Sequence, residues 1–513
     1  MIVDKLPILS ALIVLPIIGG VIVGCSANKG RAKSIAVFVA LIELFLSLIV
    51  CYCLNYDNAG FQLVDRHRWI ADLGVEYLVG VDGISVLFLP MSALITLMVI
   101  CSSWNSIQHM EAFHYALVLA LEGVTMGVFT ALDTVLFFLF WELTLPPIFF
   151  LMGLWGIGPH RRAAAIKYTL FMLFGGAALL LAFILLALNT TMPENSAVPG
   201  LVFSLPVLLE NPVSDDLQGI VFVLLMLGFA VKTPLIPFHT WMPTATMEGS
   251  PPLAALLTGL KLGAYGIIRF AMPLAPSAAV EYSWLLGVLG ALTLLYGALI
   301  ALYQTNLRRL LAYASISHVG LVVVGIASLN LQGIQGAVFQ LLNFTAVASS
   351  LMLIAGFIQH RLGSTETVHL GGLAKVMPKL TSFYFIFTLA SIGIPGTSGF
   401  PAEFLLIVSA LMAHPSLGIA ALAAAVLGAA YMLDFTRKAF LGPIIHQSVK
   451  QCQDLRRREM LLLSVPAALV IVIGFFPNPI LQLPSKSVDG WLSRILEQPV
   501  KSDEVASIDS LGK

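Results

Sequence analysis

Long apolar runs recur along almost the whole chain, and they constrain the fold more than any single motif does. A helix that crosses about 30 Å of hydrocarbon needs roughly 20 predominantly apolar residues, and 58% of the 513 residues are hydrophobic while only 11% are charged. We therefore predict an all-α polytopic membrane protein with about fourteen transmembrane helices. The predicted spans are 5–25, 33–54, 76–101, 112–131, 133–154, 165–190, 217–238, 251–273, 282–303, 308–328, 333–359, 380–410, 416–440 and 459–480.

The distribution of basic residues supports this count. Loops after even-numbered spans offer little besides Arg66 and Arg68, and the 191–216 loop is acidic. By the positive-inside rule, the odd-numbered loops face the cytoplasm or its equivalent, and both termini face the other side. The basic residues of the odd-numbered loops are Lys29, Arg31, Lys33, Arg161, Arg162, Arg308, Arg309, Arg361, Lys375, Lys379, Arg437, Lys438, Lys450, Arg456, Arg457 and Arg458.

Several chemistries have no support in the sequence. The 27 basic and 27 acidic residues balance, so the charge gives no reason to expect a nucleic-acid partner, and the lipid bilayer is the expected environment. No Walker loop, dinucleotide fingerprint or haem-attachment motif is present, and the five cysteines lack metal-ligand spacing. We expect no cofactor, no metal and no redox chemistry in this chain.

Ionisable residues inside the spans are the candidate functional residues, because each costs about 2.5–3.5 kcal/mol at a helix centre on insertion scales. They are Glu142, Lys232, Lys261, His318 and Glu403, which together form a series of acids and bases. Burial lowers the proton affinity of a lysine and a nearby carboxylate raises it, so such a pair can exchange a proton near neutral pH. The series therefore favours proton transfer through the membrane.

Prolines and glycines interrupt two of the predicted spans close to these charges. Pro234 and Pro237 follow Lys232 in span seven, and "IPGTSGFP" precedes Glu403 in span twelve. Irregular backbone at membrane depth is tolerated only where protein or a watered cavity surrounds it, and paired broken helices are typical of inverted-repeat transporters. We expect residues 1–111 to hold the first three helices, 112–273 and 282–440 to be two five-helix inverted repeats, and 441–513 to hold the last helix and a polar tail.

Structural roles remain open for these residues. Glu142 and Lys232 could be an ion pair that links two helices, and His318 could bridge helices by hydrogen bonds. Glu122, in the apolar stretch "LALEGVTMG", could make a structural hydrogen bond, lie at the lipid edge or take part in proton uptake. His239 is a further possible site residue beside the break in span seven.

The motifs "FFLFWELTLPPIFFLMGLWG", "FAVKTPLIPFHTWMP", "GLKLGAYGIIRF", "QTNLRRLLAYASISHVG" and "LASIGIPGTSGFPAEF" resemble the antiporter-like membrane subunits of respiratory complex I and of multisubunit sodium/proton antiporters. The resemblance covers about residues 80–440 in order. It implies a fourteen-helix fold, partner subunits in a membrane complex, and an energy-transducing membrane. It also implies that Glu142 modulates Lys232, that Lys232 carries the input-side proton, that Lys261 and His318 belong to a central hydrophilic axis, and that Glu403 is the output-side group.

The chain departs from the family pattern at two places. The stretch "HTWMPTATMEGSPPLAALLTG" lacks the aspartate and second histidine that usually follow "HxWLP", and Asn343 stands where family members commonly carry a histidine. Asparagine can hydrogen-bond but cannot take up a proton. The possible functions are therefore a proton-translocating complex I-type subunit, a proton-conducting subunit for carbon dioxide or bicarbonate uptake, a sodium/proton antiporter subunit, a solute carrier, or a scaffold that has lost transport.

Overall fold

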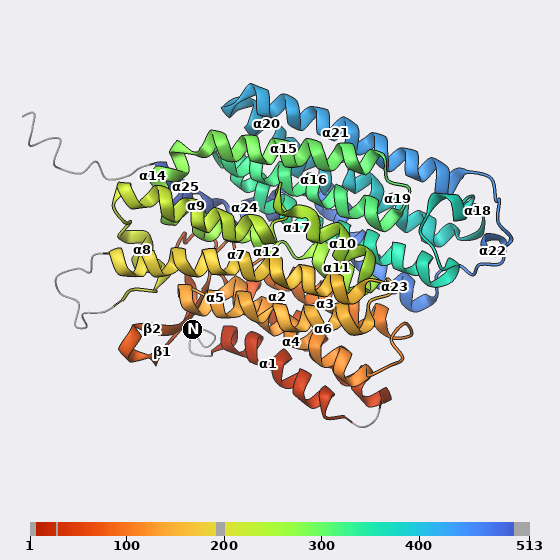
Figure 1. Ribbon diagram of the computed structural model, residues 1–513, viewed down its shortest axis with the longest axis horizontal. Coiled ribbons are helices and arrows are strands. Elements are labelled where there is room, and N and C mark those ends of the chain that lie inside the picture. Colours follow the sequence, from red (N-terminus) through yellow and green to blue (C-terminus); the bar gives the residue numbers. More distant parts are fainter. Residues whose placement is uncertain (1–6, 27–28, 191–200, 497–513) are drawn as a thin grey trace, which may run out of the picture.

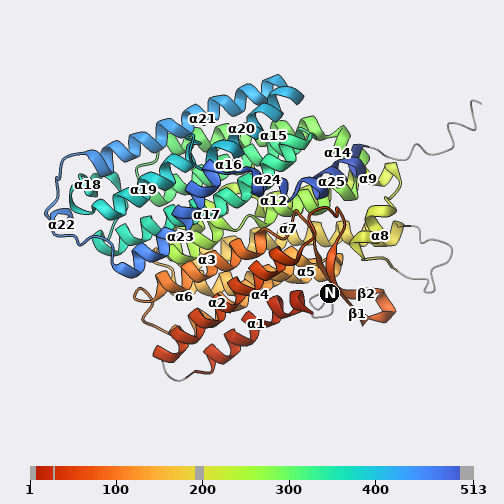
Figure 2. The same cartoon turned by 180° about the vertical axis from the view of Figure 1, so that it is seen from behind.

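The computed structural model describes residues 7–26, 29–190 and 201–496, and the helices run side by side along the longest axis of the molecule (Figure 1). The first helices form one edge of the bundle and the α20 and α21 helices form the opposite edge, as the reverse view also shows (Figure 2). The uninterrupted long helices are Ile8–Gly24 (α1), Lys29–Cys53 (α2), Phe88–Ser103 (α3), Glu111–Thr130 (α4), Arg161–Asn189 (α7), Ser283–Leu302 (α15), Leu307–Ala327 (α16), Leu331–Leu362 (α17), Pro415–Thr436 (α21) and Arg457–Phe475 (α23).

The number of spans agrees with the prediction. Within the described ranges, ten helices are long and apolar enough to cross a membrane. The α1 and α3 helices, the Asp215–Lys232 helix (α9) and the pair Pro378–Ser391 (α19) and Gly399–Ala413 (α20) occupy the four remaining predicted positions. The predicted residues 5 and 6 of the first span and most of the polar C-terminal tail, 497–513, lie outside the described residues.

The third predicted span was placed too early in the chain. Residues Gln62–Ile70 (β1) and Val75–Val81 (β2) form an antiparallel hairpin, and the α3 helix begins only at Phe88. A short apolar run such as "VEYLVGV" fits a buried strand as well as a helix, and hydrophobic periodicity alone does not separate the two. The hairpin is the one departure from the predicted all-α class among the described residues.

Spans seven and twelve are broken, as predicted. The α9 helix ends at Lys232, and the helix resumes at Trp241–Glu248 (α10); in span twelve the break runs from residue 392 to 398. Neighbouring groups satisfy the exposed backbone, which is the condition for irregular structure in hydrocarbon. The Trp241 indole donates to the carbonyl of Val231 over 2.8 Å, and the Ser398 amide donates to the carbonyl of Val470 over 2.9 Å.

Two further spans are divided where no break was expected. Span five consists of Thr134–Leu143 (α5) and Leu145–Trp155 (α6). Span eight consists of Pro251–Gly259 (α11), Leu262–Gly266 (α12), a π-helical turn at Ile267–Ala271 (η4) and Met272–Leu274 (α13). The remaining short helices are Leu205–Glu210 (α8), Pro276–Glu281 (α14), Leu373–Val376 (α18), Gln447–Lys450 (α22), Asn478–Gln482 (α24) and Ser485–Leu496 (α25).

A buried ion pair fastens the far part of span eight to the N-terminal third of the chain. Arg269, in the π-helical turn, donates to both carboxylate oxygens of Asp82 over 2.8 and 2.6 Å, and the hydroxyl of Tyr265 accepts from Nε over 3.2 Å. The Trp491 indole of the α25 helix donates to the carbonyl of Ile268 over 2.7 Å. Three parts of the chain that are distant in sequence therefore meet at this turn.

We expect Asp82→Asn to lower the free energy of unfolding by about 3–5 kcal/mol, because it leaves the buried Arg269 guanidinium without its carboxylate. Thermal unfolding of the purified protein in detergent measures this loss as a lower Tm. The matched control is Glu76→Gln, which breaks the pair between Glu76 and the exposed Arg66 (2.7 Å) and should cost at most about 1 kcal/mol. Equal Tm shifts for the two variants would contradict the assigned role of the Asp82 pair.

Candidate functional site

Glu142 lies near the end of the α5 helix, just before its interruption. Asp133 caps the start of this helix by accepting from the amides of Val135 and Leu136 over 2.9 and 3.0 Å. Pro146 and Pro147 follow Glu142 by one turn, and because proline has no N–H, the carbonyls of residues 142 and 143 lack their usual helical donors. Oε1 of Glu142 has no hydrogen-bond partner in the part of the chain that the structure describes, and it lies where a Cβ on Gly176 would stand.

Lys232 is the last residue of the α9 helix and points its ammonium group at the interruption of span five. Nζ donates to the hydroxyl of Thr144 over 2.8 Å and to the carbonyl of Trp141 over 3.2 Å, and it lies 3.9 Å from the centroid of the Trp141 ring. The ammonium group is thus held by a hydroxyl, a carbonyl and an aromatic face rather than by a direct contact with the Glu142 carboxylate.

A small space lies between the breaks of spans seven and eight. It has a volume of about 40 Å³, and its wall includes Lys232, Thr144, Tyr168, Leu260 and Leu262. One water needs roughly 10–15 Å³ of such volume together with polar partners. The cavity is therefore large enough for water beside the Lys232 ammonium group and the backbone on either side of Lys261.

The two breaks also meet through their backbones. A Cβ added at Gly263 would lie 2.9 Å from the carbonyl carbon of Lys232 and 2.5 Å from the amide nitrogen of Thr233. These distances are shorter than real carbon contacts, so only glycine permits the α12 helix to approach the end of the α9 helix this closely. The approach fixes the relative position of Lys232 and Lys261.

Lys261 occupies the non-helical joint between the α11 and α12 helices, with φ −104° and ψ 48°. Its side chain is buried, and Nζ donates to the hydroxyl of Ser315 on the α16 helix. Ser315 and His318 are three residues apart and so lie on the same face of the α16 helix. Ser315 was not predicted, although the motif "YASISHVG" contains it.

His318 is the point at which the α16, α17 and α20 helices meet. Its Nδ1 lies 3.5 Å from Oε1 of Glu403 and 3.4 Å from Nε2 of Gln340, and its ring centroid lies 4.1 Å from that of Phe344. The structure thus brings together two of the predicted residues, His318 and Glu403. A cavity of about 20 Å³ adjoins them and reaches Ser391 and Tyr431, which is enough for one water.

Asn343 connects the His318 group to the break in span twelve. Its amide donates to Oε1 of Gln340 over 3.2 Å, and its carbonyl oxygen accepts from the Ser398 hydroxyl over 2.6 Å. Gln340 was not predicted; its signal was a polar residue three positions before Asn343 in the mainly apolar stretch "AVFQLLNF". Asn343 therefore forms a hydrogen-bonded bridge between Gln340 and Ser398.

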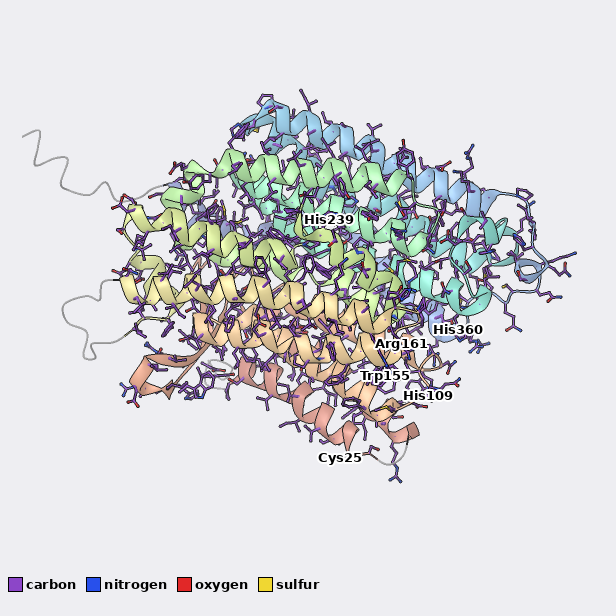
Figure 3. All side chains as sticks on the ribbon, in the orientation of Figure 1. Cys25, His109, Trp155, Arg161, His239 and His360 are labelled. Atoms are coloured by element: carbon purple, nitrogen blue, oxygen red, sulfur yellow. The ribbon has the colours of Figure 1, made fainter. Side chains whose placement is uncertain are left out.

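Two of the possible site residues lie apart from this series. His239 is buried in the segment between the α9 and α10 helices, where its ring packs edge-on against Tyr296 at 5.0 Å, and its Nδ1 has no partner among the described residues. Figure 3 places His239 in the middle of the bundle, whereas Trp155, Arg161 and His360 lie toward one end.

Glu122 lies in the α4 helix, and its burial contradicts the predicted position at the lipid edge. Its side chain is 2% exposed, so it is not at the lipid edge, and neither carboxylate oxygen has a hydrogen-bond partner among the described residues. A second buried carboxyl group, Glu43 of the α2 helix, interacts electrostatically with Glu122, and its oxygens also lack partners among the described residues. Glu43 was missed, although "FVALIELFLSLIV" places it alone in an apolar run.

No group of three or more histidine, cysteine, aspartate or glutamate side chains that could hold a metal occurs in the described ranges. The site is therefore a series of lysine, histidine and carboxyl side chains with hydroxyls and small cavities between them. Such a series can store protons and pass them on through water.

Comparison with known proteins places this chain among membrane subunits. A family model described as "NADH:quinone oxidoreductase/Mrp antiporter, TM" matches residues 131–428. The chain is 34% identical to NADH-quinone oxidoreductase subunit M of Rickettsia prowazekii, covering 95% of this chain and 99% of that protein, and 33% identical to F(420)H(2) dehydrogenase subunit M of Methanosarcina mazei, covering 93% and 96%. It superposes on a chain of respiratory complex I from Thermus thermophilus with a TM-score of 0.86 at 29% identity, covering 95% of this chain and 99% of that one.

Gly263→Ala should lower the free energy of unfolding by about 1–3 kcal/mol, because the added methyl group collides with the backbone of Lys232 and Thr233. The matched control is Gly153→Ala in the α6 helix, where nothing lies within 4 Å of the added Cβ. That variant should be neutral or slightly stabilising, since alanine favours helix more than glycine does. Thermal unfolding in detergent measures both, and a Gly263→Ala protein as stable as Gly153→Ala would show that the two breaks are not packed this tightly.

Proposed function

The chain belongs to the NADH:quinone oxidoreductase/Mrp antiporter transmembrane family, and we propose that it is the proton-translocating subunit of a respiratory complex, of the type of complex I subunit M. The relatives named subunit M match over nearly their whole length as well as nearly the whole of this chain. The observation that carries the proposal is the buried series Lys232, Lys261, His318 and Glu403. Lys261 contacts Ser315 and His318 lies beside Glu403, while one small cavity adjoins Lys232 and a second adjoins His318 and Glu403.

Lys232 and Lys261 are the two ends of the first transfer step. A proton leaving the Lys232 ammonium group enters the 40 Å³ cavity by way of water and passes on to Lys261, whose chain neighbours Leu260 and Leu262 line this cavity. Thr144 and the carbonyl of Trp141 orient the donor, and Leu260 and Leu262 keep the rest of the cavity wall apolar. A narrow wet passage in a dry wall permits proton hopping and excludes hydrated ions.

Glu142 controls this step from the opposite side of Lys232. With Lys232 turned toward Trp141, Oε1 of Glu142 has no hydrogen-bond partner among the described residues. A shift of the ammonium group toward Glu142 would form the ion pair and raise the proton affinity of Lys232, while the observed arrangement releases it. The two arrangements are the loading and release states of the carrier.

The second transfer step runs from Lys261 through Ser315 to His318 and Glu403. The His318 ring contacts Glu403 directly, and the adjoining cavity gives Glu403 a path toward Ser391 and Tyr431 at the break in span twelve. Glu403 is then the output group. Asn343 and Gln340 hold the geometry of this end and do not carry the proton, because neither amide can be protonated in this range.

We further infer the arrangement around this path. Residues 112–273 and 282–440 are two inverted five-helix repeats, with the break after Lys232 corresponding to the break before Glu403. The basic loops face the cytoplasm and both termini face the opposite side of a bacterial cytoplasmic membrane. Partner subunits of the complex supply the redox energy, since the chain itself contains no motif for a redox cofactor. Glu43 and Glu122 lie to the side of the main series and are a candidate site of proton uptake.

Lys232→Ala should abolish proton translocation while leaving the complex assembled. The measurement is proton uptake by proteoliposomes that contain the purified native assembly, with its subunits identified by mass spectrometry. Lys379→Ala, which removes an exposed lysine from the start of the α19 helix, is the control and should behave like wild type. Normal proton movement by an assembled Lys232→Ala complex would make Lys232 a structural residue and would overturn the proposed path.

Asn343→Leu should slow proton translocation severalfold without abolishing it, because it removes the bridge between Gln340 and Ser398 but no proton carrier. Ser350→Ala on the same helix is the matched control, since the Ser350 hydroxyl has no partner among the described residues. Complete loss of proton uptake in Asn343→Leu, at normal assembly, would show that Asn343 is part of the path itself.

A further inference from the structure

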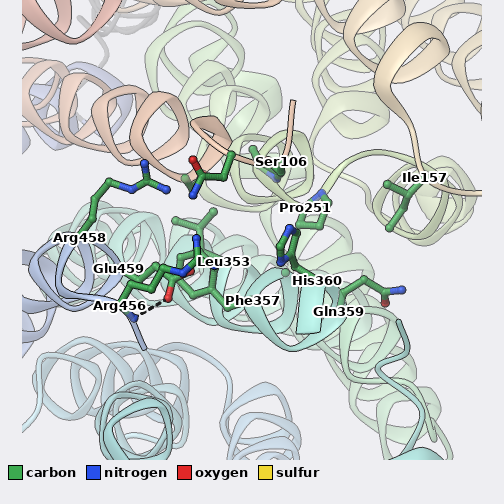
Figure 4. Close-up of a pocket in the computed structure, with 14 residues that line it drawn as sticks. Ser106, Ile157, Pro251, Leu353, Phe357, Gln359, His360, Arg456, Arg458 and Glu459 are labelled. Carbon is green, nitrogen blue, oxygen red and sulfur yellow. Dashed lines mark hydrogen bonds between the residues drawn. The ribbon is translucent and has the colours of Figure 1, made fainter. Parts of the chain in front are cut away.

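A large crevice opens at the end of the bundle that carries the basic loops, far from the buried series described above. Its volume is about 300 Å³, and it lies where the ends of the α3 and α17 helices meet the starts of the α11 and α23 helices (Figure 4). A space of this size matches the lower range of small-molecule sites and greatly exceeds the volume of a few waters. The proton path uses none of the residues that line it.

One wall of the crevice is apolar. Ile157, Pro251, Leu353 and Phe357 form much of it, and Figure 4 shows these side chains around the opening. Ile157 is 48% exposed although it is a large aliphatic side chain. These apolar side chains can contact a hydrocarbon chain, but they provide no polar group that would bind a small hydrophilic ion.

Another part of the lining, the basic wall, carries charged side chains. Arg456 and Arg458 line it together with His360 and Glu459. Glu459 is already engaged by Arg361 over 2.5 Å and by the Arg456 amide over 2.9 Å. No carboxylate in the described residues pairs with the guanidinium groups of Arg456 and Arg458, and Arg458 is 5.8 Å from the centroid of the Trp104 ring.

The basic wall is also the boundary with a second, more polar space. That cavity has a volume of about 430 Å³, and it shares His360, Arg456 and Glu459 with the crevice. The remainder of its lining is polar and includes Arg361, Ser448 and Gln451. A ligand that fills both spaces must be apolar at one end, anionic in the middle and hydrophilic at the other end.

From this juxtaposition we propose that the crevice binds one anionic phospholipid. The phosphate pairs with Arg456 and Arg458, an acyl chain lies along Ile157, Pro251 and Phe357, and the hydrophilic headgroup occupies the adjoining cavity. Basic pockets between transmembrane helices at the cytoplasmic surface are suited to acidic headgroups, and tryptophans such as Trp104 concentrate at the same depth. The lipid would connect the α23 helix with the α3, α11 and α17 helices at the basic end of the bundle.

The test compares lipid retention by the purified native assembly in nanodiscs of phosphatidylcholine that contain a small fraction of phosphatidylglycerol. Native mass spectrometry counts the phosphatidylglycerol that stays bound. The variant Arg456→Gln/Arg458→Gln should weaken retention by roughly tenfold or more, because each arginine near the surface contributes to the attraction of an acidic lipid. The control Arg162→Gln/Lys379→Gln removes two exposed charges from the starts of the α7 and α19 helices, and it should retain the lipid as wild type does.

A second variant separates a lipid from free phosphate. Ile157→Ser removes apolar contact but no charge, so it should weaken phosphatidylglycerol retention, and excess inorganic phosphate should not displace the lipid from the wild type. Equal retention in the Arg456→Gln/Arg458→Gln variant and its control would overturn the proposal. Displacement by inorganic phosphate, together with no effect of Ile157→Ser, would overturn it as well and would identify the crevice as an anion site. Proton uptake is not part of this measurement, so its result is independent of the proposed proton path.

Discussion

The structure depends throughout on the cost of leaving a charge or a backbone amide without a partner in hydrocarbon. Lys232, Lys261 and Glu403 each lie at or beside a break in a helix, where hydroxyls, carbonyls and small cavities replace part of the lost hydration. The same breaks would be unstable without the side chains that satisfy them, as Trp241 does for Val231. A buried charged side chain needs the polar groups that a helix break exposes, and the exposed backbone needs polar partners in turn. This explains why the buried charges and the helix breaks occur at the same positions along the chain.

Much of the fold and of the site can be predicted from the sequence, because a membrane requires long apolar spans and makes buried charges costly. The apolar runs predict the spans, and the basic loops predict which side of the membrane each loop faces. A lone Lys232 or Glu403 in an apolar run indicates function, because a charge there is costly. The breaks in spans seven and twelve are visible as prolines and glycines. The buried charges are unusual in apolar spans, but hydrophobic periodicity does not order them along a path. Their order from an input-side to an output-side group comes from the resemblance to a known family.

The features that the sequence did not reveal share one property, which is dependence on contacts between distant segments. The break at Lys261 contains no proline, and the contact beside it, Gly263 packed on the backbone of Lys232, leaves no mark in the sequence except a glycine. Ser315 and Gln340 are ordinary polar residues until the fold places them beside Lys261 and His318. The apolar β2 strand of the hairpin resembles the beginning of a helix in sequence. Glu43 can be recognised as a candidate site residue only when the fold brings it near Glu122 of another helix.

The division of span eight has a mechanical consequence. The α11 helix is fastened to the α17 helix, where the hydroxyls of Ser349 and Thr345 donate to the carbonyls of Ala255 and Gly259, each over 3.1 Å. The segment beyond the joint is fastened instead to Asp82 and Trp491 through the π-helical turn. Lys261 therefore lies at the joint between two segments of span eight that contact different parts of the protein. A small rotation of one segment relative to the other would move the Lys261 ammonium group without disrupting the packing of either segment.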